Sequence, residues 1–329
     1  MEDIDKLFKT FSSLRVGVIG DVMLDTYMWG NVERISPEAP VPVVSMHHRE
    51  QRIGGAGNVA LNICSLGGKA SIISVIGNDE EGKKLQDLFN ENQIDTSYLA
   101  QSGDRITTNK IRIISRNQQM MRLDAEITND LNSELENLLF ESLTQFINKE
   151  KPNIIIFEDY NKGVLTENFI SRAISLCRRK KVITAADPKR KNFFSYRHVD
   201  IYKPNLKEVK EGLNLIFDEV SLSLLKNIHA EIHKLLKHRV SLITLSEKGI
   251  FYQDSNNAAI IPSHMRKISD VSGAGDTVIA VASLVYAATQ NAHLMAEVAN
   301  IAGGLVCEEV GTAAVKKEKL LQECMFLLS

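Results

Sequence analysis

The segment DVSGAGDTVIAVASLVYAA, residues 270–288, places carboxylates on both sides of a run of very small residues. Gly273, Ala274 and Gly275 at the start of a helix would leave backbone N–H groups unblocked, and these groups form a site for negative charge. Asp276 would repel a merely bound anion, but it could act as a base during phosphoryl transfer to a hydroxyl. The alternative is a tight turn with Asp276 as an ordinary first-turn helix acid. These residues alone leave both interpretations open.

Apolar strands alternate with helical patterns along most of the chain, which is typical of an α/β fold with a mostly parallel sheet. Ligands bind at the carboxyl ends of the strands in such sheets. Four polar residues fall at predicted strand ends: Asp21, Glu158, Asp187 and Ser246.

Two segments, about 26–53 and 104–124, alternate like strands but have no helix between their strands. They predict β-ribbons inserted into the α/β body. We expect them to form a small antiparallel sheet that acts as a lid.

The composition excludes several classes of protein. The chain has 329 residues, a formal net charge of -2 and 44% hydrophobic residues. It therefore offers no electrostatic footprint for nucleic acid or an anionic membrane. The four cysteines form no CxxC pair, which favours reduced thiols. Without a secretory signal or a long apolar stretch, we expect a cytoplasmic protein with no nucleic-acid or membrane partner.

Three short segments nearly match the sequence motifs of known binding or catalytic sites. GNDEEGKK (77–84) lacks the hydroxyl that a phosphate-binding loop needs after its lysine, and predicts a strand–turn–helix junction. GAGNVA (55–60) fits a dinucleotide fingerprint but does not follow the first strand, so a dehydrogenase is only a minor alternative. HAEIH (229–233) lacks the order of a zinc protease helix and favours a solvated helix face.

Taken together, the motifs resemble the signatures of the ribokinase-like (PfkB) carbohydrate kinases. Six motifs of this chain follow the order of the family's signatures. They are GGAGN (54–58), VIGNDEEG (75–82), KPNLKE (203–208), TLSEKG (244–249), DVSGAGDT (270–277) and ANIAGGLVCEEVGT (299–312). The resemblance covers essentially the whole chain. It implies one kinase domain over residues 1–329, with a three-layer αβα core and the two ribbons as lid insertions.

The resemblance also implies roles for individual residues. Asp276 would be the general base, and Gly273, Ala274 and Gly275 the anion hole. ATP would meet Asn205, Glu208, Ser246, Gly249, Gly273, Gly275 and Asn300. Glu208 would reach Mg²⁺ through water, and Asp270 would hold a monovalent cation such as K⁺. The sugar would contact Asp25, Gly54, Gly55, Asn58, Asp159, Lys162, Asp187 and Lys189.

Residues 20–44 (GDVMLDTYMWGNVERISPEAPVPVV) most resemble the opening of bacterial heptose-7-phosphate kinases. That branch phosphorylates O1 of D-glycero-β-D-manno-heptose 7-phosphate, on the way to ADP-heptose for lipopolysaccharide. The chain departs from the branch at Glu158, Asn161 and Ala186, where serine, glycine and valine are expected. No nucleotidyltransferase motif follows, so we expect the kinase without a fused nucleotidyltransferase domain, acting as a homodimer through its lid strands.

The substrate of this branch already carries a phosphate, which a cation should meet. The sequence offers Arg34, Lys110, Arg112, Arg122, Lys162 and Lys189 and does not choose among them. Two alternatives to the heptose kinase stay open. One is another sugar kinase, such as a ribokinase or a phosphofructokinase, and the other is a non-catalytic sugar or nucleotide sensor.

Overall fold

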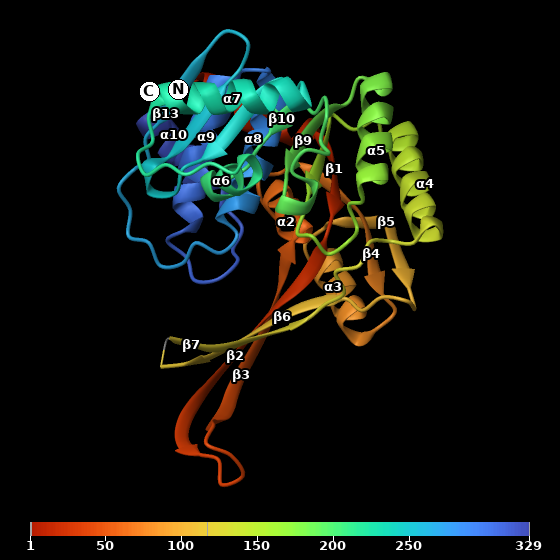
Figure 1. The fold of residues 1–329 in the computed structure, drawn as a ribbon, viewed down its shortest axis with the longest axis vertical. Coiled ribbons are helices and arrows are strands. Elements are labelled where there is room, and N and C mark those ends of the chain that lie inside the picture. The colour runs from red at the N-terminus through yellow and green to blue at the C-terminus, as the bar shows by residue number, and fades with distance from the viewer. Residues whose placement is uncertain (1, 117, 329) are drawn as a thin grey trace.

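The structure is a computed structural model that describes residues 2–116 and 118–328. A nine-stranded sheet forms its centre, in the order β13-β12-β11-β10-β9-β8-β1-β4-β5 (Figure 1). Neighbouring strands are parallel except at β11–β12 and β12–β13. The strands are β1 (Arg15–Gly20), β4 (Lys69–Gly77), β5 (Asp95–Ser102), β8 (Ile154–Glu158), β9 (Ile183–Asp187), β10 (Ile201–Tyr202), β11 (Val240–Thr244), β12 (Ile250–Gln253) and β13 (Ala258–Ile261).

Helices cover both faces of this sheet, so the predicted three-layer α/β architecture is confirmed. One face packs against α1 (Glu2–Thr10), α2 (Ala56–Ser65), α3 (Glu80–Glu91), α8 (Ala274–Thr289), α9 (Ala292–Val306) and α10 (Lys317–Leu327). The other packs against α4 (Ser133–Glu150), α5 (Glu167–Lys180), α6 (Leu206–Leu213) and α7 (Leu222–Leu236). Short 3₁₀ turns lie at η1 (Phe11–Ser13), η2 (Arg190–Asn192) and η3 (Ser246–Lys248).

The strand sequences explain the two cores. In β8, Ile154 and Ile156 belong to the core on the α8 side, while Ile155 and Phe157 belong to the core on the α4 side. Such strands are apolar throughout because both of their faces are buried. Helix α8 is likewise buried from Asp276 to Tyr286, so its first turn is held inside the molecule.

A second sheet projects from this body (Figure 1), and we call it the small sheet. It has the order β3-β2-β6-β7, from β2 (Val22–Ile35), β3 (Pro42–Gly55), β6 (Thr108–Ser115) and β7 (Gln118–Ala125). The expectation of an antiparallel sheet is wrong at one pair, since β2 and β6 run parallel. The chain passes through α2, β4, α3 and β5 between these strands, and a long crossover permits parallel pairing.

The register of the small sheet separates two faces. Asp25 pairs with Lys110, and Tyr27 pairs with Arg112, which places these four residues on one side, the inner face. The next residues along the strands form the opposite side, the outer face, which is apolar: Met28, Ile111, Ile113, Met121 and Leu123.

Among the helices of the described residues, none is both long and apolar enough to cross a lipid bilayer.

The prediction of a solvated face for HAEIH is wrong at His229, which is buried and hydrogen-bonded to Ser241 at 2.9 Å. The reason is that this face of α7 packs on β11, which a surface pattern does not reveal.

Candidate active site

Asp276 is in the first turn of α8, and its side chain is buried. Asn58 of α2 donates a hydrogen bond to its Oδ2 at 2.8 Å, and the Tyr160 hydroxyl donates to Oδ1 at 2.6 Å. Burial raises the pKa of Asp276 to about 6, although both hydrogen bonds oppose the rise. Such a carboxylate is ionised at neutral pH and is suited to take a proton from a hydroxyl.

The loop before α8 presents backbone N–H groups beside this carboxylate. Gly273 is the N-cap residue with a φ of 77°, and the N–H groups of Gly273 and Gly275 have no hydrogen-bond partner among the described residues. The N–H of Ala274 donates to the carbonyl of Val271 at 3.3 Å. Of the three residues predicted for the anion hole, Gly273 and Gly275 thus have unpaired N–H groups, whereas the N–H of Ala274 closes the turn.

Two further carboxyl groups stand at neighbouring strand ends. Glu158 and Asp187 are register partners at the ends of β8 and β9, on the sheet face that α8 covers. Burial raises the pKa of Glu158 well above its usual value, and the charges of Asp187 and Asp276 add to the rise. Neither oxygen of Glu158 has a hydrogen-bond partner among the described residues. This environment therefore favours the protonated form of Glu158.

Two lysines neutralise Asp187. The buried Lys203 lies 2.7 Å from Oδ2, and Lys189 lies 3.3 Å from Oδ1. Burial alone would raise the pKa of Asp187, but these cations hold it below its usual value. A Cβ on Gly275 would lie 3.6 Å from Nζ of Lys203. Positive charge therefore lies beside the free N–H groups.

Asn205 and Glu208 form a capping box at the start of α6. The Asn205 side chain accepts from the Glu208 N–H at 2.8 Å, and Oε2 of Glu208 accepts from the Asn205 N–H at 2.8 Å. The second oxygen, Oε1, pairs with Lys189 at 2.7 Å. The predicted NxxE pair thus starts a helix and also joins the lysine network.

Within residues 2–116 and 118–328, no cluster of three His, Cys, Asp or Glu side chains could hold a metal ion. Mg²⁺ usually keeps several waters and binds one or two carboxylates together with substrate phosphates. Glu208 and Asp187, which share Lys189 as a partner, supply such carboxylate oxygens. All four oxygens of this pair contact a lysine or a backbone N–H, so the pair suits a hydrated magnesium ion that arrives with nucleotide phosphates and is held through water.

Asp25 is buried at the base of the small sheet and accepts a hydrogen bond from Arg112 at 2.5 Å. A Cβ on Gly54 would lie 2.4 Å from Oδ2 of Asp25. Gly55 has a φ of 58°, and a Cβ there would lie 2.4 Å from the carbonyl oxygen of Asp21. The glycine pair is therefore required for close chain packing around Asp25.

The loop after β8 is held in place by Asp21, which directly follows β1. Its carboxylate accepts from the backbone N–H groups of Tyr160 at 2.8 Å, Lys162 at 3.0 Å and Val164 at 3.1 Å. Burial raises the pKa of Asp21 to about 6. Asp21 therefore positions this loop, and with it the Tyr160 side chain that bonds to Asp276.

Asp159 does not present a free carboxylate to a substrate. It is buried, and its oxygens accept from the Asn161 N–H, the Asn192 amide and the Tyr196 hydroxyl at 2.8 to 2.9 Å. Both oxygens of Asp159 thus bind donors inside the protein, and its contact with the sugar stays a prediction.

The six cations that the sequence offers for a substrate phosphate differ in their partners. Four are paired with carboxylates: Arg112 with Asp25, Arg122 with Asp124, Lys162 with Glu126, and Lys189 with Asp187 and Glu208. Arg34 is exposed near the far end of β2. The side-chain amine of Lys110 has no hydrogen bond or ion pair among the described residues, and its Nζ lies 4.8 Å from the centre of the Tyr160 ring.

The other predicted nucleotide ligands lie around β11 to β13. Ser246 is exposed with a φ of 56°, and a Cβ on Gly249 would lie 2.0 Å from the carbonyl oxygen of Ile261. Asn300 donates to the carbonyl of Pro262 at 2.8 Å. Gly249 is therefore required by strand packing, and Asn300 holds the loop that follows β13.

Asp270 does not fit the predicted cation site. Its Oδ1 accepts from the N–H and hydroxyl of Ser272, both at 2.9 Å, and its Oδ2 accepts from the Gly311 N–H at 2.9 Å. Its oxygens are thus occupied by donors from two loops, which the carboxylate ties together.

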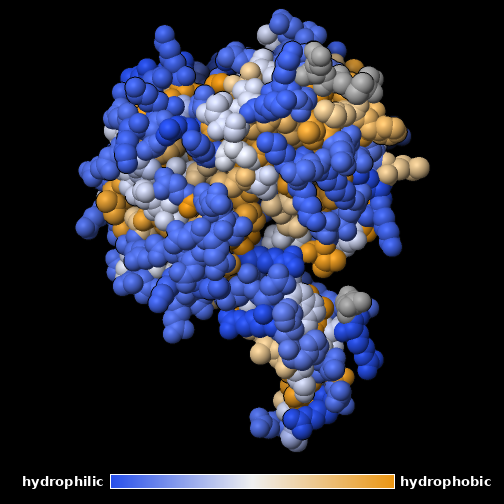
Figure 2. All heavy atoms as spheres, turned by 180° about the vertical axis from the view of Figure 1, so that it is seen from behind, coloured by the Kyte–Doolittle hydropathy of each residue, from blue (hydrophilic) through white to orange (hydrophobic). Residues whose placement is uncertain are grey.

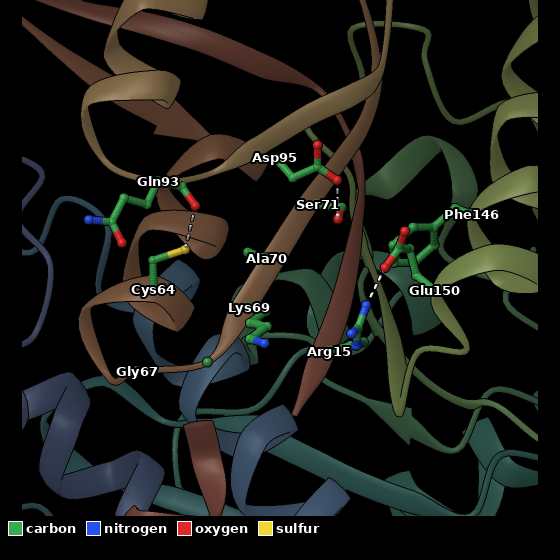
Figure 3. Close-up of a pocket in the computed structure, with 11 residues that line it drawn as sticks. Arg15, Cys64, Gly67, Lys69, Ala70, Ser71, Gln93, Asp95, Phe146 and Glu150 are labelled. Carbon is green, nitrogen blue, oxygen red and sulfur yellow. Dashed lines mark hydrogen bonds and ion pairs between the residues drawn. The ribbon is translucent and has the colours of Figure 1, made fainter. Parts of the chain in front are cut away.

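A cavity of about 420 Å³ lies elsewhere, where β1 and β4 begin (Figure 3). Figure 3 shows Arg15, Lys69, Asp95 and Glu150 around it, with Arg15 paired to Glu150. Because Asp276, Glu158 and Asp187 gather at the carboxyl ends of the strands, this cavity lies at the opposite edge of the sheet.

Sequence reasoning did not assign Tyr160 or Lys203 to the site. Lys203 directly follows the buried strand β10, the kind of position where Asp21 was noticed. Tyr160 had no such signal, because its contact with Asp276 joins residues that are 116 positions apart.

A model of the pfkB family of carbohydrate kinases matches residues 13–319. The chain belongs to this family. Its members transfer a phosphoryl group to a sugar hydroxyl, and the base and anion-binding N–H groups described above suit that reaction. The family membership, the fold and the enzyme class expected from the sequence are thereby confirmed.

Curated relatives carry the name bifunctional protein HldE. That of Geobacter sulfurreducens is 35% identical over 97% of this chain and 65% of its own length. That of Aliarcobacter butzleri is 38% identical over 93% of this chain and 63% of its own length. The chain thus spans about two thirds or less of these relatives.

Solved structures show the same fold at low identity. Phosphofructokinase-2 from Escherichia coli, in complex with potassium, aligns with a TM-score of 0.80 at 18% identity, over 96% of this chain and 99% of its own. Arabidopsis thaliana ribokinase, complexed with ribose and ATP, aligns with a TM-score of 0.71 at 15% identity, over 94% and 98%.

Proposed function

We propose that this chain transfers a phosphoryl group from ATP to O1 of D-glycero-β-D-manno-heptose 7-phosphate. The observation that carries the transfer is the buried Asp276 carboxylate beside unpaired N–H groups at the start of α8. The resemblance of residues 20–44 and the relatives named HldE support the sugar. The proposal concerns the kinase step alone.

In this mechanism Asp276 takes the proton of the attacking hydroxyl, while Asn58 and Tyr160 hold its carboxylate in place. The N–H groups of Gly273 and Gly275 donate to the transferring phosphoryl group as its charge develops. Magnesium neutralises phosphate charge when it is bound with nucleotide, and Glu208 would hold it through water.

The inner face of the small sheet supplies the sugar contacts in this proposal. Asp25 is held by Arg112 at the base of that face, and Asn58 lies against Asp276. Lys110 is our candidate for the substrate phosphate, because it is the cation of the six that is unpaired and close to Tyr160. Burial lowers the pKa of Lys110, and an arriving phosphate would restore its preference for the charged form.

Replacement of Asp276 tests the transfer step. Asp276→Asn should lower kcat by about 10²- to 10⁴-fold, because the amide cannot accept the proton. The Kd for ATP should change little. Steady-state turnover and nucleotide titration measure the two quantities, with the exposed Asp104→Asn as the control. Unchanged turnover in Asp276→Asn would refute the role of base.

Substrate comparison tests the sugar. ATP consumption should be strong with heptose 7-phosphate and weak with ribose, fructose 6-phosphate or no sugar.

Replacement of Lys110 tests the contact with the substrate phosphate. Lys110→Met should raise the KM for heptose 7-phosphate by about 10- to 100-fold, as loss of a charge-assisted hydrogen bond predicts, without changing the KM for ATP. The control is Arg122→Met, on the same face but paired with Asp124. An equal KM effect in both variants would exclude the specific role of Lys110.

The outer face of the small sheet is the part of the molecule from which we infer an oligomeric state. We propose that a second copy covers this apolar face, on which Met121 is 55% exposed and Leu123 is 48% exposed. Figure 2 shows the small sheet as an arm that stands away from the body, so its faces are accessible to a partner.

A further inference from the structure

Arg52, on β3, inserts its guanidinium into the loop that follows α9. Nη1 donates to the carbonyl of Val310 at 2.7 Å and lies 3.3 Å from that of Thr312. The other edge of the guanidinium pairs with Glu50, through Nε at 2.7 Å and Nη2 at 3.2 Å. Its centre also lies 5.0 Å from the middle of the Tyr27 ring. The guanidinium is thus held by two backbone carbonyls, one carboxylate and one aromatic ring.

The same loop is connected to the first turn of α8. The N–H of Gly311, between the two carbonyls, donates to Asp270 at 2.9 Å. Asp270 in turn accepts from Ser272, the residue before Gly273. Arg52 therefore holds, through one loop and one carboxylate, the segment that carries the free N–H groups.

A bare monovalent cation beside Asp270 would compete for oxygens that this arrangement already uses. Backbone carbonyls and carboxylates are the oxygen ligands that protein cation sites supply. Here the carbonyls of Val310 and Thr312 face Nη1 of Arg52, and the carboxylate of Asp270 accepts three donors. A second positive charge at this place would be repelled by the guanidinium.

We propose that the Arg52 guanidinium takes the place of a monovalent cation, so that phosphoryl transfer by this chain needs no K⁺. Arg52 is a positioning residue: it fixes the 310–312 loop, and through Asp270 the segment before α8. The inference requires the kinase class but not the identity of the sugar.

The unmodified protein gives the first test. Turnover should change by less than about twofold when KCl is replaced by tetramethylammonium chloride at equal ionic strength. The Tm of the protein with ATP alone should not differ between the two salts, and this readout needs no sugar. A K⁺-specific rise in turnover or Tm would overturn the proposal, whereas failure on the heptose alone would concern only the proposed substrate.

Variants at Arg52 give the second test. Arg52→Gln should lower kcat by about tenfold or more, because the segment with the N–H groups loses its anchor. Added K⁺ should restore part of this loss and raise the Tm of this variant. The matched control is Arg49→Gln, an exposed arginine on the same strand. Arg52→Lys, which keeps the charge, should stay indifferent to K⁺. If Arg52→Gln behaves like the control, the proposal is wrong.

Discussion

Asp276 combines burial with hydrogen bonds that favour its charged form. Burial raises its pKa to about 6, and the bonds from Asn58 and Tyr160 limit the rise. As a base it must be deprotonated, so activity should be present above this pKa and lost as the pH falls through about 6.

Tyr160 can be tested through that acid limb. Tyr160→Phe removes the hydrogen bond at 2.6 Å that lowers the pKa of Asp276. The acid limb of kcat/KM should therefore move to higher pH, while the rate at high pH changes less. A pH profile of kcat/KM measures this, and Tyr252→Phe on β12 is the control. An acid limb that stays in place would show that Tyr160 does not tune Asp276.

The sequence supported Asp276 but gave no account of its partners. A carboxylate after Gly-Ala-Gly is visible as a local pattern. The raised pKa of Glu158 and the pairing of Asp187 with Lys203 arise only when separate strands end side by side. Asp159 shows the reverse case, because a carboxylate that follows a strand can bind internal donors that the sequence does not reveal.

At the scale of elements, the start of α8 depends on a glycine. Gly273 has a φ of 77°, and a Cβ there would lie 2.7 Å from Nδ2 of Asn58. A side chain at this position would meet both backbone strain and the partner of Asp276.

Gly273→Ala should therefore impair both stability and catalysis. We expect a loss of about 1–2 kcal/mol in the free energy of unfolding from the left-handed backbone. The displaced Asn58 should also lower kcat. Thermal unfolding and turnover measure these effects against Gly103→Ala, since a Cβ on Gly103 meets nothing within 4 Å. Equal behaviour of the two variants would contradict this account of the helix start.

The elements themselves were largely predictable. Alternating apolar strands and helices indicated the parallel sheet, and both ribbon segments form strands of the small sheet. The parallel pairing of β2 with β6 was not predictable from a local pattern, because it depends on where the chain returns after β5.

At the scale of the whole molecule, the outer face of the small sheet remains uncovered within one chain. A second copy on this face would bury Met121 and Leu123, and dimers of this kind are stabilised by apolar area removed from water.

The double variant Met121→Asp with Leu123→Asp should therefore be monomeric, whereas the unmodified chain should sediment as a dimer. Analytical ultracentrifugation distinguishes the two. Leu138→Asp, at an exposed position on α4, controls for the added charge. A monomeric unmodified chain, or a variant that still dimerises, would rule out this interface.

The hydrogen bond between Asn58 and Asp276 joins residues 218 positions apart in the chain. A chain emerging from the ribosome therefore contains the residues of the small sheet and Asn58 long before it contains α8. Until then it has neither the base nor the N–H groups beside it. The proposed active site can therefore be completed only late in synthesis, when α8 packs against α2.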